Sequence, residues 1–177
     1  MSEVQLALAR WANFYLSMAA AAATLIGLLF VVIALVAGGT VKNPAEGMAK
    51  IRVYLTPTVV YFASVLFVAA LLTFPNHTRL TAVLCISIAG AAGLLYSGCF
   101  IVGDDKRSYN KRLDRIAYAV LPFLAYGLLV FGGVSLLHDT QRGLTFAAIG
   151  MLLLLAVGVR NSWAIAIAIV SFTVKIV

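Results

Sequence analysis

Charged residues are scarce in this chain and are missing from most of its length. Only 11% of the 177 residues are Asp, Glu, Lys or Arg, whereas a soluble domain carries about a quarter. Apolar residues make up 63% of the sequence, and the mean hydropathy is +1.06. This composition excludes a soluble enzyme, a disordered protein and a disulfide-rich secreted module. It is typical of an integral membrane protein.

Cysteine is also rare, with two residues in the chain. Cys85 and Cys99 lie in one apolar run, about 21 Å apart along a helix, so they can neither bridge each other nor share a metal ion. A buried cysteine behaves as a small apolar residue, and we expect both to serve packing.

The net charge of +7 raises the question of a nucleic-acid partner. The basic residues lie in short segments between long apolar runs, and no aromatic platform accompanies them. This arrangement favours anionic lipid headgroups over nucleic acid.

The charged residues divide the chain into runs of 17 to 31 uncharged residues, each close to or above the roughly 20 residues that cross the hydrocarbon core as a helix. Backbone polar groups in lipid must be paired within the segment, so helices are expected. The sequence therefore predicts an all-α, polytopic membrane helix bundle with a single membrane domain over residues 1–177. The five expected helices span about 12–37, 53–74, 80–102, 116–137 and 143–159.

Lys and Arg are distributed unevenly between alternate connections. The first and third connections hold eight of them, whereas the N-terminus and the second and fourth connections together hold three. Because basic connections stay in the cytoplasm, we expect the N-terminus outside and the long connections inside.

Residues 160–177 form an apolar extension that is too short for a comfortable span. Two interpretations stay open: one long helix over 143–177 that leaves the membrane at Arg160, or a break at Asn161–Ser162 followed by a half-span that returns into the bilayer. Four residues of the extension follow a 4-3-4 spacing and share one face of the helix, which indicates a contact between copies of the chain. These residues are Ile165, Ile169, Phe172 and Ile176.

Small residues recur at four-residue spacing within two expected helices. Ala89, Gly93 and Ser97 form such a ridge on the third helix, and Ala19–Ala23 with Gly27 forms another on the first. Ridges of this kind allow transmembrane helices to approach closely.

Proline interrupts two of the expected helices, at Pro57 and Pro122, and should bend them. Tyr118 and Tyr126 flank Pro122 on the same face. This polar kink either lines a pore or a ligand cleft, or its tyrosines bond to neighbouring backbone.

Three connections carry polar side chains with potential chemistry. His77, His138 and Asp139 fall on the outer side in this topology and are candidates for a metal or haem site; the alternative is that they are wetted residues at helix ends. The third connection, which is expected in the cytoplasm, has mixed charge. It either contacts lipid headgroups or a partner protein, or serves only to orient the chain in the membrane. Its basic residues include Lys106, Arg107, Lys111 and Arg112.

The five expected spans contain no Asp, Glu, Lys, Arg or His. Proton relays and ion-coupled carriers place such groups at membrane depth, and intramembrane proteases need a base or metal ligands there. We therefore expect neither an enzyme nor a coupled transporter, and no cofactor.

Three segments resemble small uncharacterised bacterial inner-membrane proteins. They are Asn13–Tyr15 with Gly27–Ala34, Thr56–Val60, and Gly158–Trp163. In some of those proteins an Asp follows the Trp, where this chain has Ala164. The resemblance implies a bacterial inner membrane and carries no assigned activity.

Three functions follow as hypotheses. The first is a non-catalytic homo-oligomeric channel whose path lies between subunits gathered by the C-terminal extension. The second is an accessory or scaffold subunit of a larger membrane complex, and the third is a haem- or metal-binding membrane protein that uses His77 and His138.

Overall fold

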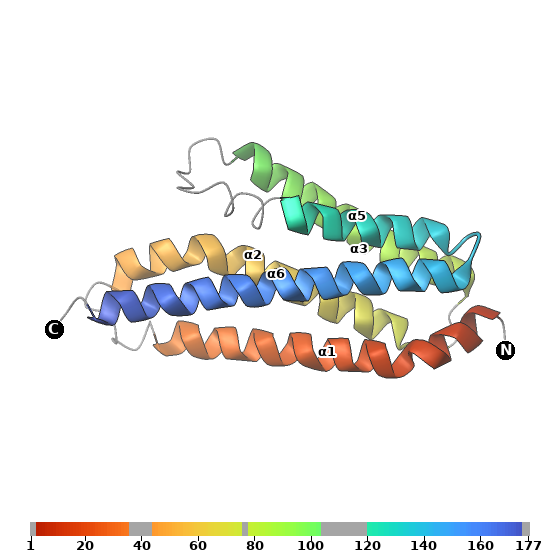
Figure 1. The fold of residues 1–177 in the computed structure, drawn as a ribbon, viewed down its shortest axis with the longest axis horizontal. Helices are drawn as coiled ribbons and strands as arrows, with labels where there is room; N and C mark the ends of the chain where they lie inside the picture. The colour runs from red at the N-terminus through yellow and green to blue at the C-terminus, as the bar shows by residue number, and fades with distance from the viewer. Residues whose placement is uncertain (1–2, 36–43, 76–77, 104–119, 175–177) are drawn as a thin grey trace.

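The computed structural model describes residues 3–35, 44–75, 78–103 and 120–174, with side chains described over 3–34, 55–75, 78–99 and 120–167. All regular secondary structure in these residues is helical, and the helices are arranged as a bundle (Figure 1). They are α1 (Glu3–Leu35), α2 (Pro44–Leu72), α3 (Arg79–Gly103), α5 (Leu121–Ser135) and α6 (Thr140–Val174).

Local side-chain bonds explain where two of the helices begin. Thr78 and Thr81 cap the start of α3 reciprocally: the N–H of Thr81 donates to Oγ1 of Thr78, and the N–H of Thr78 donates to Oγ1 of Thr81. At the start of α6, Oδ1 of Asp139 accepts the N–H of Arg142 at 3.1 Å. Pro44 is the first residue of α2, where a missing N–H costs nothing.

Helices α1, α3 and α6 begin at one end of the bundle, and α2 and α5 end there (Figure 1). We name it the Arg79 end, and the opposite one the far end. Helices α1 and α6 run parallel, with Nε1 of Trp11 lying 3.5 Å from its acceptor, Oε1 of Gln141. Helix α1 begins and α6 ends at opposite ends of the bundle (Figure 1).

Helices α3, α5, α6 and α2 form an open ring in this order, and α1 packs against α2 and α6 at its edge. Helix α6 packs on α5, on α2 and, less extensively, on α1, while α3 packs on α5. Helices α2 and α3 are consecutive in sequence but touch only sparsely. The ring is therefore open between α2 and α3.

Glycines bring α5 and α6 close together. A β-carbon on Gly132 would come within 2.8 Å of the backbone nitrogen of Ala147, and one on Gly150 within 2.8 Å of the carbonyl oxygen of Ala125. On the other side of α6, Gly158 lies against the ring of Phe62 on α2. Dispersion contacts at these close approaches stabilise helix pairs in lipid, where the hydrophobic effect is weak.

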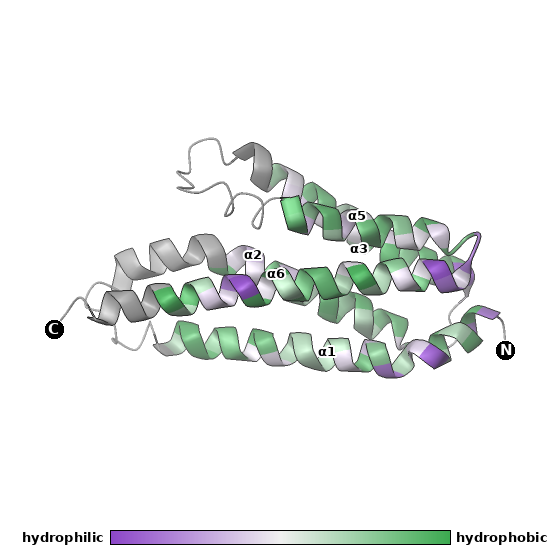
Figure 2. Cartoon of the chain, viewed as in Figure 1, coloured by the Kyte–Doolittle hydropathy of each residue, from purple (hydrophilic) through white to green (hydrophobic). Residues whose placement is uncertain are grey.

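Four of the described helices are long and apolar enough to cross a membrane, and α5 is a shorter apolar helix of 15 described residues. Large apolar side chains such as Leu16, Phe67 and Leu95 are exposed on the outside of the bundle. The helices are predominantly hydrophobic, with hydrophilic segments at the Arg79 end and part-way along α6, where Arg160 and Asn161 lie (Figure 2). The fold is the expected α-helical membrane bundle.

The helix boundaries differ from the expected ones. Helix α1 begins at Glu3 rather than at residue 12, and α2 begins at Pro44 rather than at residue 53. Charged residues such as Lys50 therefore mark a limit of the apolar run but do not end the helix. Helix α5 is described only from Leu121, and residues 116–119 of the expected helix lie outside the described residues.

Helix α6 continues through Asn161 and Ser162 to Val174 without a break. The described residues therefore agree with the single long helix and show no break at Asn161–Ser162, while its exit from the membrane at Arg160 stays a prediction. The Oγ of Ser162 donates to the carbonyl oxygen of Gly158 at 2.9 Å, so its hydroxyl is satisfied within its own helix. The exposed Trp163 follows, one turn beyond Arg160.

Candidate functional site

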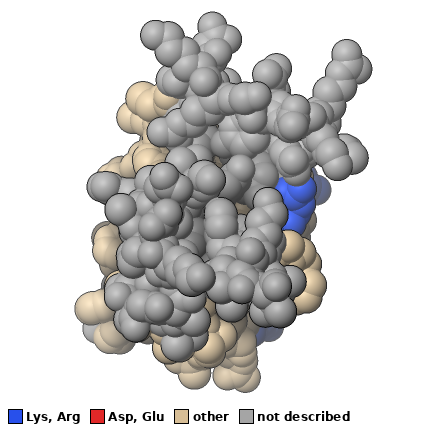
Figure 3. All heavy atoms as spheres, turned by 90° about the vertical axis from the view of Figure 1, so that its left-hand side faces the viewer, with Lys and Arg blue, Asp and Glu red and all other residues tan. Residues whose placement is uncertain are grey.

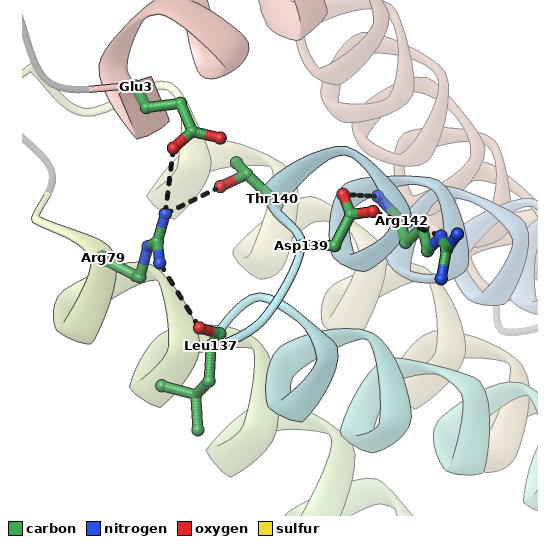
Figure 4. Close-up of polar contacts among 6 residues, drawn as sticks. All are labelled: Glu3, Arg79, Leu137, Asp139, Thr140 and Arg142. Carbon is green, nitrogen blue, oxygen red and sulfur yellow. Dashed lines mark hydrogen bonds and ion pairs between the residues drawn. The ribbon is translucent and has the colours of Figure 1, made fainter.

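The guanidinium of Arg79 joins three segments at the Arg79 end (Figure 4). Its Nη2 lies 3.2 Å from Oε2 of Glu3 on α1 and 3.4 Å from Oγ1 of Thr140 on α6. Its Nη1 donates to the carbonyl oxygen of Leu137 at 3.3 Å. Thr140 is buried. This arrangement ties α1, α3 and the turn between α5 and α6 together.

The proposed metal ligands are only partly covered by the described residues. Both carboxylate oxygens of Asp139 are used by Arg142: Oδ1 caps the helix, and Oδ2 lies 3.1 Å from Nε (Figure 4). His138 is exposed in the same turn, and His77 lies outside the described residues. The part of the chain that the structure describes contains no group of three potential metal ligands.

Tyr126 on α5 is completely buried, which differs from the pore-lining position that its spacing suggested. Its hydroxyl lies 2.9 Å from Oγ of Ser64 on α2, and its ring centroid is 6.3 Å from that of Tyr61. Pro122 is buried in the first turn of α5, and Tyr118 lies outside the described residues. Tyr126 therefore links α2 to α5 inside the protomer.

The small residues of α3 that contact α5 differ in part from the expected ridge of Ala89, Gly93 and Ser97. Gly93 is buried against the ring of Tyr126, and Gly90 is buried against Val130, with a β-carbon there coming within 2.8 Å of the Val130 backbone nitrogen. Ser97 is buried one turn further along. Ala89 is half-exposed and lines a groove instead. The close approach of α3 to α5 therefore depends on Gly90 and Gly93.

A groove of about 700 Å³ follows the opening between α2 and α3. Its described lining combines small residues with larger apolar ones and includes no charged residue. Its lining consists of Val60, Ala63, Ser64, Phe67 and Leu71 from α2, and Leu84, Cys85, Ile88, Ala89, Ala92, Gly93 and Tyr96 from α3. This volume is in the range of small-molecule sites.

Helix α1 is the least buried of the long helices: only 17% of its apolar stretch is buried, against 50% in α2 and α6. One of its exposed faces carries small and polar residues at alternating spacings of four and three. We name this face the α1 stripe; it consists of Asn13, Ser17, Ala20, Thr24 and Gly27. The small-residue spacing from Ala19 to Gly27 indicated a packing ridge but not that its polar members face outward.

The α1 stripe points away from the rest of the bundle, because it lies opposite the buried face that carries Tyr15, Ala22 and Leu29. The hydroxyls of Ser17 and Thr24 donate to backbone carbonyl oxygens one turn earlier, at 2.8 Å in both cases. Their remaining lone pairs stay free to accept hydrogen bonds.

Asn161 on α6 is a buried polar residue that sequence reasoning treated only as a possible break. It is completely buried, and neither its Oδ1 nor its Nδ2 has a hydrogen-bond partner. It lies between Gly158 and Ile165, which both face Phe62, so its side chain falls on the same face of α6.

Ile165 is buried against Leu29, Leu55 and Phe62 of its own chain, with 2% of its surface exposed. It therefore does not belong to an exposed seam between subunits, because α1 and α2 extend alongside this part of α6. The side chains of Ile169 and Phe172 lie outside the described residues, as does Ile176. The same is true of the basic residues Lys106, Arg107, Lys111 and Arg112.

Comparisons with protein-family models, with curated proteins and with solved structures find no match. The function of the chain has to be inferred from its own residues and their geometry.

Proposed function

We propose that this protein is a non-enzymatic, homo-oligomeric channel of the membrane, in which the α1 stripe of each copy faces a common path. The observation that carries the proposal is the polar, small-residue character of the α1 stripe on the most exposed span. A side chain that faces only lipid gains nothing from a hydroxyl or amide group. A side chain that faces water or a neighbouring helix can use such a group in a hydrogen bond.

The amide of Asn13 strengthens this assignment. It is exposed and makes no hydrogen bond within the described residues. It lies near Trp11, at the Arg79 end, where a mouth of the path would open. Ser17, Thr24 and Gly27 would follow along the path at successive depths.

The path would lie between subunits, because the interior of one protomer is filled. Tyr15, Tyr61 and Tyr126 occupy its core, and the expected spans carry no charged side chain. Contacts through α1 take the place of the C-terminal seam, since Ile165 already packs within its own protomer.

Arg10 would set the ionic preference of this channel. It is exposed on α1 one turn before Asn13, and it makes no ion pair or hydrogen bond within the described residues, whereas Arg79 and Arg142 pair with Glu3 and Asp139. A ring of Arg10 residues at the mouth would concentrate anions. We therefore assign a preference for small anions.

The orientation belongs to the same proposal. The resemblance to bacterial inner-membrane proteins supports that membrane, and the distribution of Lys and Arg supports an orientation with the Arg79 end outside and the basic connections in the cytoplasm. Seen from the far end, the described side chains include few charged ones (Figure 3).

An accessory subunit of a larger complex is the second candidate, because a helix of another protein would cover the α1 stripe equally well. The two candidate functions predict assemblies of different polypeptide composition. Native mass spectrometry from the original membrane should find a fixed multimer of this chain for a channel, and a second polypeptide in fixed ratio for an accessory subunit.

The channel itself is tested by chloride flux into liposomes that contain the purified protein. Thr24→Leu should abolish most of the flux by blocking the path, whereas Ala91→Leu, at an exposed small residue on α3, should leave it unchanged. Arg10→Glu should shift the preference from anions towards cations. Equal flux with the two leucine variants, or no flux above empty liposomes, would refute the proposal.

A further inference from the structure

The groove between α2 and α3 plays no part in the proposed channel, whose path lies along α1. It is bounded by two apolar helices that touch only sparsely. Phe67, Leu84 and Ile88 along it are more than half exposed, so in a membrane the groove opens sideways to the hydrocarbon. A molecule would reach it from the bilayer rather than from water.

The described lining of the groove is apolar and uncharged, which disfavours an ionic headgroup as its content. An ion without a partner would have to be desolvated at a cost of several kcal/mol or more. Its occupant is therefore neutral, and about 700 Å³ accommodates a molecule of the size of one long hydrocarbon chain or a fused-ring lipid.

The groove also presents a hydrogen-bond acceptor, on Ser64. The hydroxyl of Ser64 donates its single proton to the carbonyl oxygen of Val60 at 2.8 Å. Tyr126 must then be the donor in the 2.9 Å contact between its hydroxyl and Oγ of Ser64. One lone pair of the Ser64 oxygen remains and can accept a hydrogen bond. The hydroxyl has no proton left to donate.

A donor is supplied by Tyr96, which lines the groove from α3 and is only partly exposed. Its hydroxyl makes no hydrogen bond within the described residues. Tyr96 lies one helical turn from Gly93, which contacts the ring of Tyr126, whose hydroxyl in turn bonds to Ser64. The free donor and the free acceptor thus lie in the same part of the groove.

We propose that the groove between α2 and α3 binds a neutral, lipid-soluble alcohol. Its hydroxyl donates to Oγ of Ser64 and accepts from the hydroxyl of Tyr96, while its hydrocarbon part lies along Phe67, Leu84 and Ile88. A single hydroxyl is the smallest group that satisfies both polar side chains, and the described lining, which holds no charged residue, matches a neutral molecule.

The proposal is tested by photolabelling in nanodiscs with three matched probes: hexadecanol that carries a diazirine in its chain, and the corresponding hexadecane and hexadecanoate. The labelled peptides are identified by mass spectrometry. The alcohol should label α2 and α3 saturably and be displaced by unlabelled hexadecanol, whereas the hydrocarbon and the carboxylate should give no saturable labelling of these helices.

Variants that remove one of the two hydroxyls test recognition of the alcohol, and a variant that fills the groove tests access to it. Ser64→Ala and Tyr96→Phe should each weaken saturable labelling about threefold to tenfold, in keeping with the loss of one hydrogen bond. Ala92→Phe should block the groove, while Ala91→Phe, at an exposed neighbour outside it, serves as the control. Thermal unfolding of every variant establishes that the fold is retained.

Two results would overturn the proposal. Labelling that is equal for alcohol and hydrocarbon and does not saturate would mean that ordinary lipid chains fill the groove. Absence of any labelling of α2 and α3, with the fold retained, would mean that the groove is closed to lipid-soluble molecules. Neither result depends on chloride flux, so the channel and the groove can fail separately.

Discussion

The backbone of Gly93 on α3 lies against the ring of Tyr126 on α5, so closely that a β-carbon at position 93 would overlap the ring. The ring cannot move freely, because the Tyr126 hydroxyl is bonded to Ser64 on α2. Glycine at this position therefore controls the spacing of two helices and the position of a third.

Gly93→Ala should lower the free energy of unfolding by about 1–3 kcal/mol, because the added methyl group overpacks this contact. Gly98→Ala on the same helix is the matched control, since nothing lies within 4 Å of its β-carbon position. The control should be neutral or stabilise by up to about 1 kcal/mol. Thermal unfolding in detergent, followed by size-exclusion chromatography, measures both; equal melting temperatures would contradict the predicted contact.

Asn161→Leu should leave the protein as stable as before or raise the free energy of unfolding by about 1–3 kcal/mol, because it removes a buried amide without partners. Asn161→Asp should lower stability strongly, because it buries a charge. Ser162→Ala is a control on the same turn. A clear loss of stability in Asn161→Leu would show that the amide has a partner in the membrane.

Ile165→Asp should unfold the protomer rather than separate subunits, because this side chain packs against Leu29, Leu55 and Phe62. We expect a loss of more than about 3 kcal/mol. Ile167→Asp, at a side chain that is 53% exposed, should leave the protomer folded. Protease sensitivity and the yield of monodisperse protein measure the difference; folded, dissociated protomers of Ile165→Asp would contradict this prediction.

Arg79→Gln should destabilise the Arg79 end, with a loss of about 1–2 kcal/mol, because it weakens contacts to Glu3, Thr140 and Leu137 together. Arg142→Gln should cost less than about 0.5 kcal/mol, since the Arg142 side chain is 80% exposed in its pair with Asp139. Hydrogen exchange at the starts of α1, α3 and α6 compares the two variants. Equal hydrogen exchange in the two variants would contradict the predicted role of Arg79 in stabilising this end of the bundle.

Hydropathy was sufficient to predict the fold class, because a chain in lipid has few alternatives to helices. The ends of the helices were predicted less well. Lys50 and Arg52 limit an apolar run, yet α2 continues past them to Pro44, since a helix can leave the membrane without ending. The start of α6 at Asp139–Thr140 follows a familiar capping pattern and could have been found from it.

The candidate sites depended on which face of each helix is covered, and periodicity alone does not determine this. Ile165 and Tyr126 had the spacing of exposed seam or pore residues but are buried within the protomer. The α1 stripe was visible as small-residue spacing, but its exposure became clear only from the position of α1 at the edge of the ring. The groove arises from the sparse contact between α2 and α3, which no local sequence pattern reports.

The positions of the two tryptophans have a practical consequence. Trp11 packs against Phe14 and Tyr15 near the Arg79 end, whereas Trp163 is 69% exposed beyond Arg160. Because α1 and α6 run parallel from Gln141, the two indoles lie about 33 Å apart along the bundle, close to the thickness of the hydrocarbon core. We therefore expect one natural fluorophore in each leaflet, and replacing either tryptophan with phenylalanine should leave an optical depth marker for a single face of the membrane.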